Sequence, residues 1–507
     1  MAAERKSDGV VVADDGVDGT APPDAKGPCF IDAGVWCEGS RSVAEGLDQP
    51  STPEGPQGGS AALSARSISR AEGVDAFQAL QRVLYRSAKQ DPQRRFHALY
   101  DKLTRRDVMW RAWVDVATNQ GAPGVDGVTI ASIEDGGVEA VRAFLDDLAA
   151  ELEAGSYRPK PLRRVNIPKP GQPGKTRPLS IPCVRDRVVM AAAKSILEPI
   201  FEADFLPCSF GFRPKRSAHQ ALEVVRTTAN QGATWVLDAD ISDCFGSLSF
   251  DAIVSQVGRR VSDAKMLKLI RAWLRVGVLE GGVVTEQVAG APQGSPVSPL
   301  LCNIVLHVLD TAWSQVGQGL GTLVRYCDDF VVLAPTRARA IAAKARIEAI
   351  LEPLGLRLHP DKTRIACLDK GQEGFVFLGF EHHMRESKKW RGRWYLQKWP
   401  SPRAMASIRA KVKQRTDLRL ASLPLEDVVG HLNSVLRGWG AYFAVGNSTE
   451  KFNAVDSYVH LRMAKLASKK HGLHGRNWAT RFTYGWLTDL GIYRLGGKVR
   501  YWRAASA

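Results

Sequence analysis

The sequence predicts an α+β fold, in which an antiparallel sheet of the split ferredoxin-like arrangement is followed by an α-helical region. Two observations predict it. Between residues 235 and 367 the apolar pattern follows the order strand, helix, strand–strand, helix, strand. After residue 400, three stretches carry apolar residues at helical spacing. In this arrangement we expect one face of the sheet to be covered, and the first strand to lie beside the hairpin.

A helix and a hairpin are predicted before this sheet. The helix starts near Ala131, carries apolar residues at helical spacing and stops at Gly155. The hairpin is "RRVNIPKPGQPGKTRPLSIP", with two alternating apolar runs joined by a Gly/Pro loop. Its tip holds three cations, Lys169, Lys175 and Arg177, which suit either a solvated turn or a phosphate contact.

Carboxylates gather at the strand ends of the predicted sheet. The strand "WVLDAD" ends at Asp240, and the hairpin "TLVRYCDDFVVLA" has Asp328 and Asp329 at its turn. Adjacent carboxylates repel, and burial makes this worse unless a cation compensates. Since the topology brings Asp240 beside Asp328, we expect the three carboxylates to hold two Mg²⁺ ions, about 3.5–4 Å apart, for phosphoryl transfer.

The charge of the chain favours a polyanionic partner. The 507 residues include 69 Lys+Arg against 53 Asp+Glu, for a formal net charge of +16. Residues 1–75 hold 6 basic and 13 acidic side chains, so the rest of the chain carries a net +23. A basic body of this kind is typical of nucleic-acid binding. No apolar run reaches the length of a bilayer span, so no membrane partner is expected.

Two further features describe the context of the protein. Residues 1–75 are rich in Gly, Pro, Ser and Asp without a periodic pattern, which predicts a disordered acidic extension that is neither a secretory signal nor a transit peptide. The eight cysteines are scattered, with no C-x-x-C pair. They indicate reduced thiols in a cytoplasmic protein and exclude a cysteine-based zinc nuclease module.

Several ordered motifs give the chain a family resemblance. Tyr326-Cys327-Asp328-Asp329 resembles the Y-x-D-D signature of reverse transcriptases, and Asp240-Ile241 with Phe245 resembles their first metal-binding motif. The chain is similar to the group II intron-encoded reverse transcriptase/maturases of bacterial type, because their other blocks follow in order over roughly residues 76–507. These blocks are "GAPGVDG", "IPKPGQPGKTRPLSIP", "SFGFRPKRSAHQAL", "PQGSPVSPLLCNI", "LRLHPDKT", "FLGF" and "LNSVLRGWGAYF".

The resemblance implies a right-hand polymerase followed by a helical thumb. The fingers and the ferredoxin-like palm would occupy residues 76–382, and the thumb or maturase domain residues 383–470. A basic aromatic segment, residues 471–507, would follow as a possible short DNA- or RNA-binding region; a small packed subdomain with a basic rim explains it equally well. The chain lacks the cysteine pairs and histidines of the HNH endonuclease that related proteins often carry here.

The resemblance also implies roles for single residues. Asp240, Asp328 and Asp329 would bind the catalytic magnesium ions, with the Ile241 carbonyl as a further ligand. Lys169 and Arg177 would clamp the incoming triphosphate. Phe245 would exclude a 2′-hydroxyl from the sugar site, and Gln293 would pack near the new base pair. Arg213 would hold the template strand or the fingers. The expected nucleic-acid-binding residues are Arg213, Lys362, Arg409, Lys413 and Arg437.

Two positions depart from the family pattern. Cys327 stands where this group commonly has alanine, and we interpret it as a small packing residue under the primer end. Gly246 stands where the family usually has an aspartate, which puts a secondary polar contact in doubt and leaves the metal site intact.

The implied function is that of an RNA-directed DNA polymerase that copies group II intron RNA and assists its splicing as a maturase. The implied partners are intron RNA, an RNA template with a DNA primer, target DNA and deoxynucleoside triphosphates. The implied location is the bacterial cytoplasm, in association with the nucleoid or a ribonucleoprotein. Two alternatives stay open: a domesticated enzyme in DNA repair or phage defence, and a splicing-only RNA-binding maturase.

Overall fold

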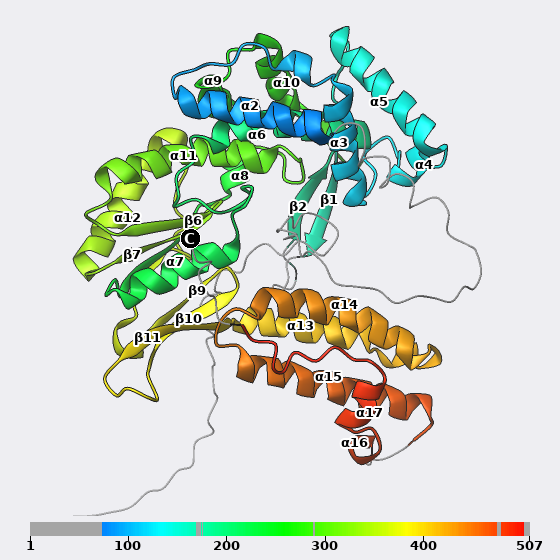
Figure 1. The fold of residues 1–507 in the computed structure, drawn as a ribbon, viewed down its shortest axis with the longest axis vertical. Helices are drawn as coiled ribbons and strands as arrows, with labels where there is room; N and C mark the ends of the chain where they lie inside the picture. Colours follow the sequence, from blue (N-terminus) through cyan, green and yellow to red (C-terminus); the bar gives the residue numbers. More distant parts are fainter. Residues whose placement is uncertain (1–73, 169–173, 175, 287–288, 474–477, 501–507) are drawn as a thin grey trace, which may run out of the picture.

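The computed structural model describes residues 74–168, 174, 176–286, 289–473 and 478–500 (Figure 1). The predicted extension, residues 1–75, lies almost wholly outside these ranges, as do Lys169 and Lys175. Figure 1 shows three parts: N-terminal helices at the top, a sheet with its helices at the left, and a stack of helices at the bottom. No helix among the described residues is long and apolar enough to cross a bilayer.

The N-terminal part is helical with a small sheet. Its helices are α2 (Val74–Gln90), α3 (Arg106–Thr118), α4 (Ile130–Glu134), α5 (Gly137–Glu153), α6 (Val184–Glu202) and α10 (Ala264–Arg275). The predicted helix from residue 131 to 155 is present as α4 and α5, and it ends before Gly155, whose φ is +68°. Helix α6 is buried along most of its length and packs against α2 and α3, so it is the centre of this part.

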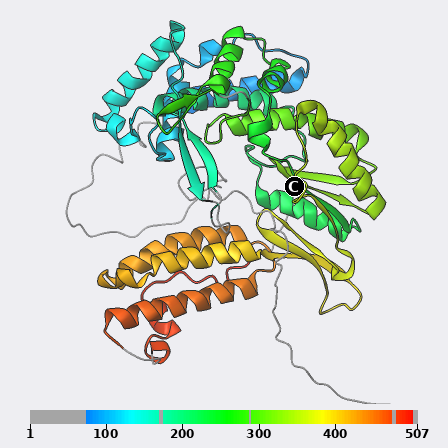
Figure 2. The same ribbon diagram turned by 180° about the vertical axis from the view of Figure 1, so that it is seen from behind.

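The predicted cationic hairpin is also present. It consists of β1 (Leu162–Pro168) and β2 (Thr176–Ile181), which pair antiparallel. The short strands β4 (Val278–Glu280) and β5 (Val283–Thr285) extend this sheet in the order β2-β1-β4-β5. Figures 1 and 2 show the hairpin reaching down from the helices toward the C-terminal helical stack.

The palm sheet has the predicted ferredoxin-like topology. It contains β3 (Trp235–Asp240), β6 (Thr322–Tyr326), β7 (Asp329–Ala334) and β8 (Arg364–Cys367), in the order β6-β7-β3-β8. All of its pairings are antiparallel. Around it lie α7 (Ala218–Asn230), α8 (Cys244–Ser247), α11 (Ser298–Val316) and α12 (Arg337–Leu351), while α9 (Phe250–Gly258) packs against α10 and α11.

The expectation that only one face of this sheet is covered is wrong. Alternate residues of β3 and β7 belong to two different cores because side chains alternate across a strand. Leu237 and Val332 pack in a core with residues of α11 and α12. Val236 and Val331 pack in a second core with residues of α7. The apolar stripe of α7, Ala221, Leu222 and Val225, supplies this second cover.

A second, three-stranded sheet follows, in the order β11-β10-β9. Its strands are β9 (Gly374–Phe377), β10 (Phe380–Glu386) and β11 (Trp394–Pro400). The domain boundary predicted at residue 382 falls inside β10. The polypeptide therefore passes from the palm to the helical part through a sheet rather than through a linker.

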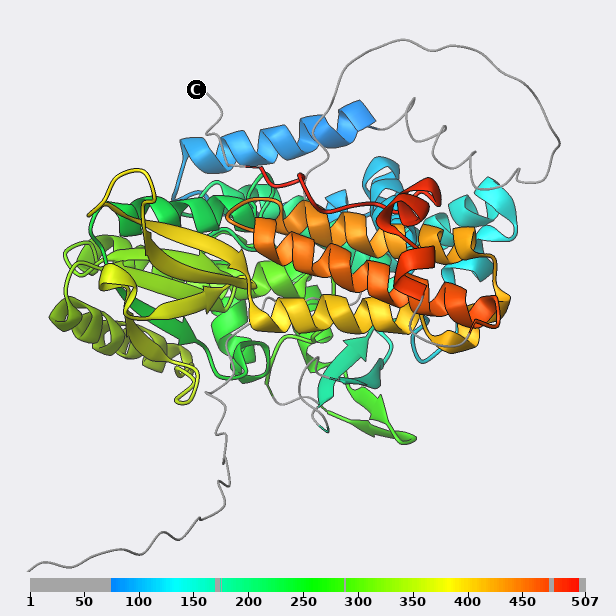
Figure 3. The same cartoon turned by 90° about the horizontal axis from the view of Figure 1, so that it is seen from below.

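The C-terminal part is the predicted helical region. Its helices are α13 (Pro402–Arg415), α14 (Leu425–Phe443), α15 (Thr449–Lys470), α16 (Trp478–Arg481) and α17 (Tyr484–Asp489), and α13, α14 and α15 are stacked side by side in Figures 1 and 3. Ser401 caps α13, since its hydroxyl accepts a hydrogen bond from the backbone N–H of Ala404. Leu487, Ile492 and Leu495 are buried in the same core as these helices, which supports the packed interpretation of the last segment.

Candidate active site

The carboxylates meet at one end of the palm sheet. Asp240 is the last residue of β3 and lies directly opposite Asp329, the first residue of β7. Asp328 precedes it in the tight turn between β6 and β7. The topology expected from the sequence therefore brings together residues that are 88 positions apart, with Asp329 rather than Asp328 as the cross-strand partner of Asp240.

The turn that carries Asp328 is strained and closely packed. Cys327 has a φ of +60°, in the left-handed region that side chains other than glycine rarely adopt. The loop around Gly211 lies against it, and a Cβ at Gly211 would come within 2.7 Å of the Cys327 nitrogen. The Phe210 N–H donates to the Arg325 carbonyl, and the Arg325 N–H donates to the Cys208 carbonyl. The block "SFGF" thus borders β6 and fixes the position of the turn.

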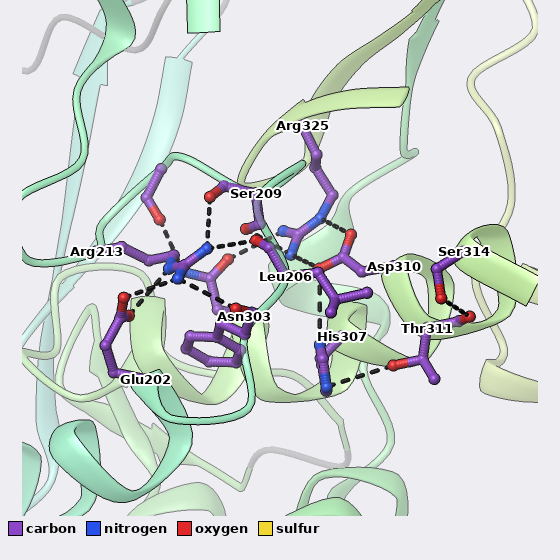
Figure 4. A network of polar contacts seen from close by, with 12 residues as sticks. Glu202, Leu206, Ser209, Arg213, Asn303, His307, Asp310, Thr311, Ser314 and Arg325 are labelled. Atoms are coloured by element: carbon purple, nitrogen blue, oxygen red, sulfur yellow. Dashed lines mark hydrogen bonds and ion pairs between the residues drawn. The ribbon is translucent and has the colours of Figure 1, made fainter. Parts of the chain in front are cut away.

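A buried ion pair between Arg325 and Asp310 (Figure 4) fixes the turn. The Arg325 side chain has no exposure, and its guanidinium donates to the Asp310 carboxylate of α11 from Nε at 2.7 Å and from Nη2 at 2.5 Å. Its Nη1 donates to the Asn303 Oδ1 and to the Cys327 carbonyl, both at 3.0 Å. Although burial works to lower it, the Asp310 carboxylate raises the pKa of Arg325 above its ordinary value. Arg325 is therefore a positioning residue for the Cys327–Asp328 turn.

Sequence reasoning missed this network. Arg325 stands in a short strand, where a single cation is typical of a solvated side chain. The available signal was Asp310, the only acidic residue within the otherwise apolar helix "SPLLCNIVLHVLDTAWSQV". A lone buried carboxylate needs a cation, but the sequence does not show which of the 69 basic residues supplies it.

The electrostatics of this sheet end suit a divalent cation. Burial, together with the negative charge of Asp240, raises the pKa of Asp328 above its usual value, while Arg177 opposes this shift. The three carboxylates and the Ile241 carbonyl offer the oxygen ligands that Mg²⁺ prefers. Among the described residues, no three acidic, histidine or cysteine groups form a ready-made metal cage.

Lys362 lies at the carboxylates. Its Nζ is 2.9 Å from the Asp240 Oδ2. The loop that carries it is held against the end of β3, because the His359 N–H donates to the Asp240 carbonyl and the Ser242 N–H donates to the Arg357 carbonyl. The predicted nucleic-acid contact of Lys362 would thus be made beside the carboxylates that are expected to bind metal.

Two predicted nucleotide-binding residues contact each other. The Arg177 Nε donates to the Gln293 Oε1 at 3.0 Å, although the two are 116 positions apart. The turn after Gln293 is pressed against β2, since a Cβ at Gly294, whose φ is +113°, would lie 2.6 Å from the Ser180 carbonyl. Phe245 is half-buried at the edge of the core, and its carbonyl accepts from the Ala291 N–H. Lys169, the fourth predicted residue, lies outside the described residues.

The position of Gly246 has a local explanation. A Cβ there would collide with the Asp243 carboxylate, at 2.2 Å from its Oδ2. The neighbouring acid Asp243 therefore occupies the space in which a larger residue at 246 would begin.

Of the two roles expected for Arg213, the structure favours holding the fingers over holding the template strand. Its guanidinium is buried and pairs with the Glu202 carboxylate at 2.7 and 2.9 Å (Figure 4). It also donates to the carbonyls of Leu206 and Ser209, each at 2.6 Å. These contacts use its donors inside the protein, so Arg213 holds the loop between α6 and α7 and does not face a nucleic-acid strand.

The remaining predicted nucleic-acid-binding residues are exposed. Arg409 and Lys413 lie one helical turn apart on α13, and Arg437 lies on α14 with its guanidinium 4.9 Å from the centre of the Tyr493 ring. Their exposure leaves them available to a polyanion.

Comparisons with known proteins agree with this site. Residues 167–382 match the family "Reverse transcriptase (RNA-dependent DNA polymerase)", and residues 405–484 match the family "Group II intron, maturase-specific domain". Protein YkfC of Escherichia coli K12 is 34% identical over 338 residues, which are 59% of this chain and 86% of YkfC.

Two intron proteins share shorter regions. The group II intron-encoded protein LtrA of Lactococcus lactis is 35% identical over 215 residues, 42% of this chain and 35% of LtrA. The putative COX1/OXI3 intron 1 protein of Saccharomyces cerevisiae is 38% identical over 168 residues, 33% of this chain and 20% of that protein. The matches thus span about a third or less of these two relatives. With a reverse transcriptase match, a maturase-specific match and the carboxylate site in one polypeptide, the chain belongs to the group II intron-type reverse transcriptases.

Proposed function

We propose that the protein copies group II intron RNA into DNA and that it binds the same folded RNA to assist its splicing. The observation that carries the polymerase half is the meeting of Asp240, Asp328 and Asp329 at one sheet end, with Lys362 and the Arg177–Gln293 pair alongside. The maturase half is supported by the match of residues 405–484 and by the exposed cations of α13 and α14.

Asp240, Asp328, Asp329 and the Ile241 carbonyl would hold two Mg²⁺ ions. When bound, these ions supply activation of the primer 3′-oxygen and stabilisation of the charge that develops on the leaving pyrophosphate. Protein side chains then serve to position the reactants, as phosphoryl transfer needs no covalent intermediate with the enzyme.

Arg177 and Gln293 would position the incoming deoxynucleoside triphosphate. The Gln293 amide orients the Arg177 guanidinium, leaving its remaining N–H groups for phosphate oxygens. Lys169 would add a second cation on the same hairpin. Phe245 would form the wall that excludes a 2′-hydroxyl, since it lies in the short helix α8, shortly after Asp240 and Ile241.

The helical part would hold the nucleic acids. Arg409, Lys413 and Arg437 would contact the phosphates of intron RNA, of the RNA template with its DNA primer, or of target DNA. We propose that the thumb begins near residue 401, after β11, and includes the packed segment up to residue 500. The protein would work in the bacterial cytoplasm, bound to intron RNA as a ribonucleoprotein and at the nucleoid during insertion.

The test is Mg²⁺-dependent extension of a DNA primer on an RNA template. We expect Asp328→Asn to lower the rate about a thousandfold or more, because loss of metal binding removes several kcal/mol of transition-state stabilisation. The variant should keep its melting temperature, because the neutral side chain relieves the burial and the repulsion that raise the Asp328 pKa.

The matched control is Asp251→Asn, which removes an exposed carboxylate on α9 and should extend primers at the wild-type rate. An absence of cDNA from the wild-type protein, with intron RNA still bound tightly, would contradict the polymerase proposal and favour a splicing-only maturase.

A further inference from the structure

The hairpin formed by β10 and β11 has one buried face and one face with half-buried rings and exposed cations. Its inner residues, including Phe380, Met384 and Leu396, belong to the core shared with the thumb helices. Its outer residues form the cross-strand pairs Glu381–Trp399, His383–Gln397 and Arg385–Tyr395. In Figures 1 and 2 this hairpin extends from the palm on the side opposite β1 and β2, away from the nucleotide-binding residues.

The rings on the outer face are held in fixed positions. The Trp399 and His383 rings are parallel within 2°, with centroids 5.6 Å apart. The Glu381 carboxylate accepts from the Trp399 Nε1 at 3.0 Å and from the His383 Nε2 at 3.1 Å. The Arg385 guanidinium lies 5.6 Å from the Trp399 ring centroid. A ligand that stacks here would lose little side-chain entropy, because these rings are ordered before it binds.

The tip of the hairpin presents a tryptophan among cations. Trp390 is 51% exposed, with the Lys389 Nζ 5.0 Å and the Arg393 guanidinium 5.8 Å from its ring centroid. The loop is ordered by its own side chains. The Ser387 hydroxyl accepts from the N–H groups of Lys389 and Trp390, and the Glu386 carboxylate accepts from the Gly392 N–H at 2.7 Å.

Between the outer face and the tip lies a hollow of about 640 Å³. Its lining includes Arg385, Lys388, Lys389, Trp394, Tyr395 and Gln397. From residue 385 to residue 395 the chain holds five basic residues and one acid, Glu386. The volume is in the range of about 300–1,000 Å³ that small-ligand sites have.

We propose that the outer face and tip of the β10–β11 hairpin, residues 381–399, bind unpaired nucleotides of a single RNA or DNA strand outside the catalytic site. Cations paired with aromatic faces fit such a strand, because the cations neutralise phosphates and the rings stack on bases. An acidic protein surface would pair with the cations, but it would not stack on the ordered rings as bases do. The inference depends on the proposed function only for the class of its partner.

The test is photo-crosslinking of the full chain to two probes, oligo(U) with 4-thiouridine and oligo(dT) with 4-thiothymidine, mapped by mass spectrometry. The yield at residues 385–399 is followed against oligonucleotide and salt concentration. We expect crosslinks in this segment with one or both probes, and the two arms decide between RNA and DNA.

Three variants sharpen the test. Trp390→Ala should weaken crosslinking at this segment about tenfold, because one stacked base is lost. Lys388→Ala/Lys389→Ala should lower the slope of log affinity against log salt by about 1.4, which corresponds to two phosphate contacts on a single strand. Arg337→Ala/Arg339→Ala, which removes two exposed cations from α12, should leave yield and slope unchanged. Unchanged melting temperatures exclude misfolding of these surface variants.

The proposal is overturned if crosslinks map only to other segments, if only duplexes compete for this one, or if the two hairpin variants behave as the α12 control does. Primer extension by the wild-type protein is measured separately. A chain that crosslinks at residues 385–399 without extending primers would refute the polymerase proposal alone. A chain that extends primers without these crosslinks would refute the hairpin site alone.

Discussion

The palm sheet and the β9–β11 sheet each bury one cation, and they treat it in opposite ways. In the palm, four acceptor groups surround the Arg325 guanidinium: the Asp310 carboxylate, the Asn303 amide, the Cys327 carbonyl and the Ser209 hydroxyl. In the second sheet, Lys398 is 4% exposed, and its ammonium has no hydrogen-bond partner among the described residues. Its nearest neighbours include the Phe380 ring, with its centroid 6.0 Å from Nζ, and His382, its cross-strand partner.

The two cations differ in whether their charge depends on pH. A fully paired buried cation stays charged, and it fixes the turn that carries Asp328. An unpaired one loses its proton more readily: burial lowers the pKa of Lys398 to about 8, and the Glu223 carboxylate only partly opposes this shift. Burial and Lys398 likewise lower the pKa of His382 to about 3, so its imidazole is neutral. The buried cation beside the Asp328 turn is thus fully paired, whereas the buried cation in the sheet that leads to the thumb is not.

The largest effect is expected at Arg325. Arg325→Met would leave Asp310 buried without its cation, which should lower the free energy of unfolding by about 3–5 kcal/mol. Replacing the partner as well, in Arg325→Met/Asp310→Leu, should recover part of this loss because no uncompensated charge remains. Urea denaturation measures both.

The control for this prediction is Arg226→Met. Arg226 is 43% exposed in its pair with Glu223, so its loss should cost less than about 1 kcal/mol. If the Arg325 and Arg226 variants lost equal stability, the contrast between satisfied and exposed charge would be refuted.

A smaller effect of opposite sign is expected at Lys398. The pKa of about 8 in the folded protein lies below the value of about 10.4 in an unfolded chain, so between these pH values the unfolded state binds more protons and stability rises with pH. Below pH 8 both states are protonated and the cost of burial is present in full. Lys398→Met should remove this cost, raising the unfolding free energy below pH 8 by up to about 3 kcal/mol and flattening its pH dependence.

Urea denaturation between pH 7 and 10 checks the prediction. The exposed Lys344→Met on α12 serves as the control and should leave the pH profile as it is in the wild type. Parallel profiles for the wild type and Lys398→Met would contradict an unpaired buried charge at this position.

The smallest effect is expected at Lys362. Its pair with Asp240 is partly exposed, at 44% and 17%, so Lys362→Ala should change the unfolding free energy by less than about 1 kcal/mol. A loss above about 2 kcal/mol in the same denaturation assay would mean that this pair supports the fold as Arg325 does. A small loss would agree with the proposed role of Lys362, which is to bind nucleic acid at the carboxylates rather than to stabilise the fold.

The sequence predicted the parts of the molecule that depend on local patterns. The β1–β2 hairpin, the strand order of the palm and the apolar stripes of α13–α15 all follow from alternation, helical spacing and turn residues. The approach of Asp240 to the Asp328–Asp329 turn followed from topology. The exact cross-strand partner of Asp240 could not be predicted, because one residue more or less in the turn shifts the register of the strands.

The missed features depend on pairs that only the folded chain brings together. The charge of Arg213 is visible in the sequence, but its buried partner Glu202 is not, so the sequence does not decide between a contact to nucleic acid and a role inside the fingers. Arg325 and Lys398 each stand in a strand where a cation usually faces water. The second face of the palm sheet is covered by α7 and by residues more than 100 positions downstream. A local sequence pattern does not show that such distant residues pack on the sheet.

That second cover has a consequence for how the protein is made. Val236, Val324 and Val331 of the palm pack in one core with Leu436, Val459 and Leu495. In a nascent chain that has just released its palm from the ribosome, α7 already lies on this sheet face, but the shared core stays incomplete until the last helices are synthesised. The core under the palm sheet is therefore complete only when translation ends. A fragment cut after residue 382 should aggregate rather than fold as an independent enzyme.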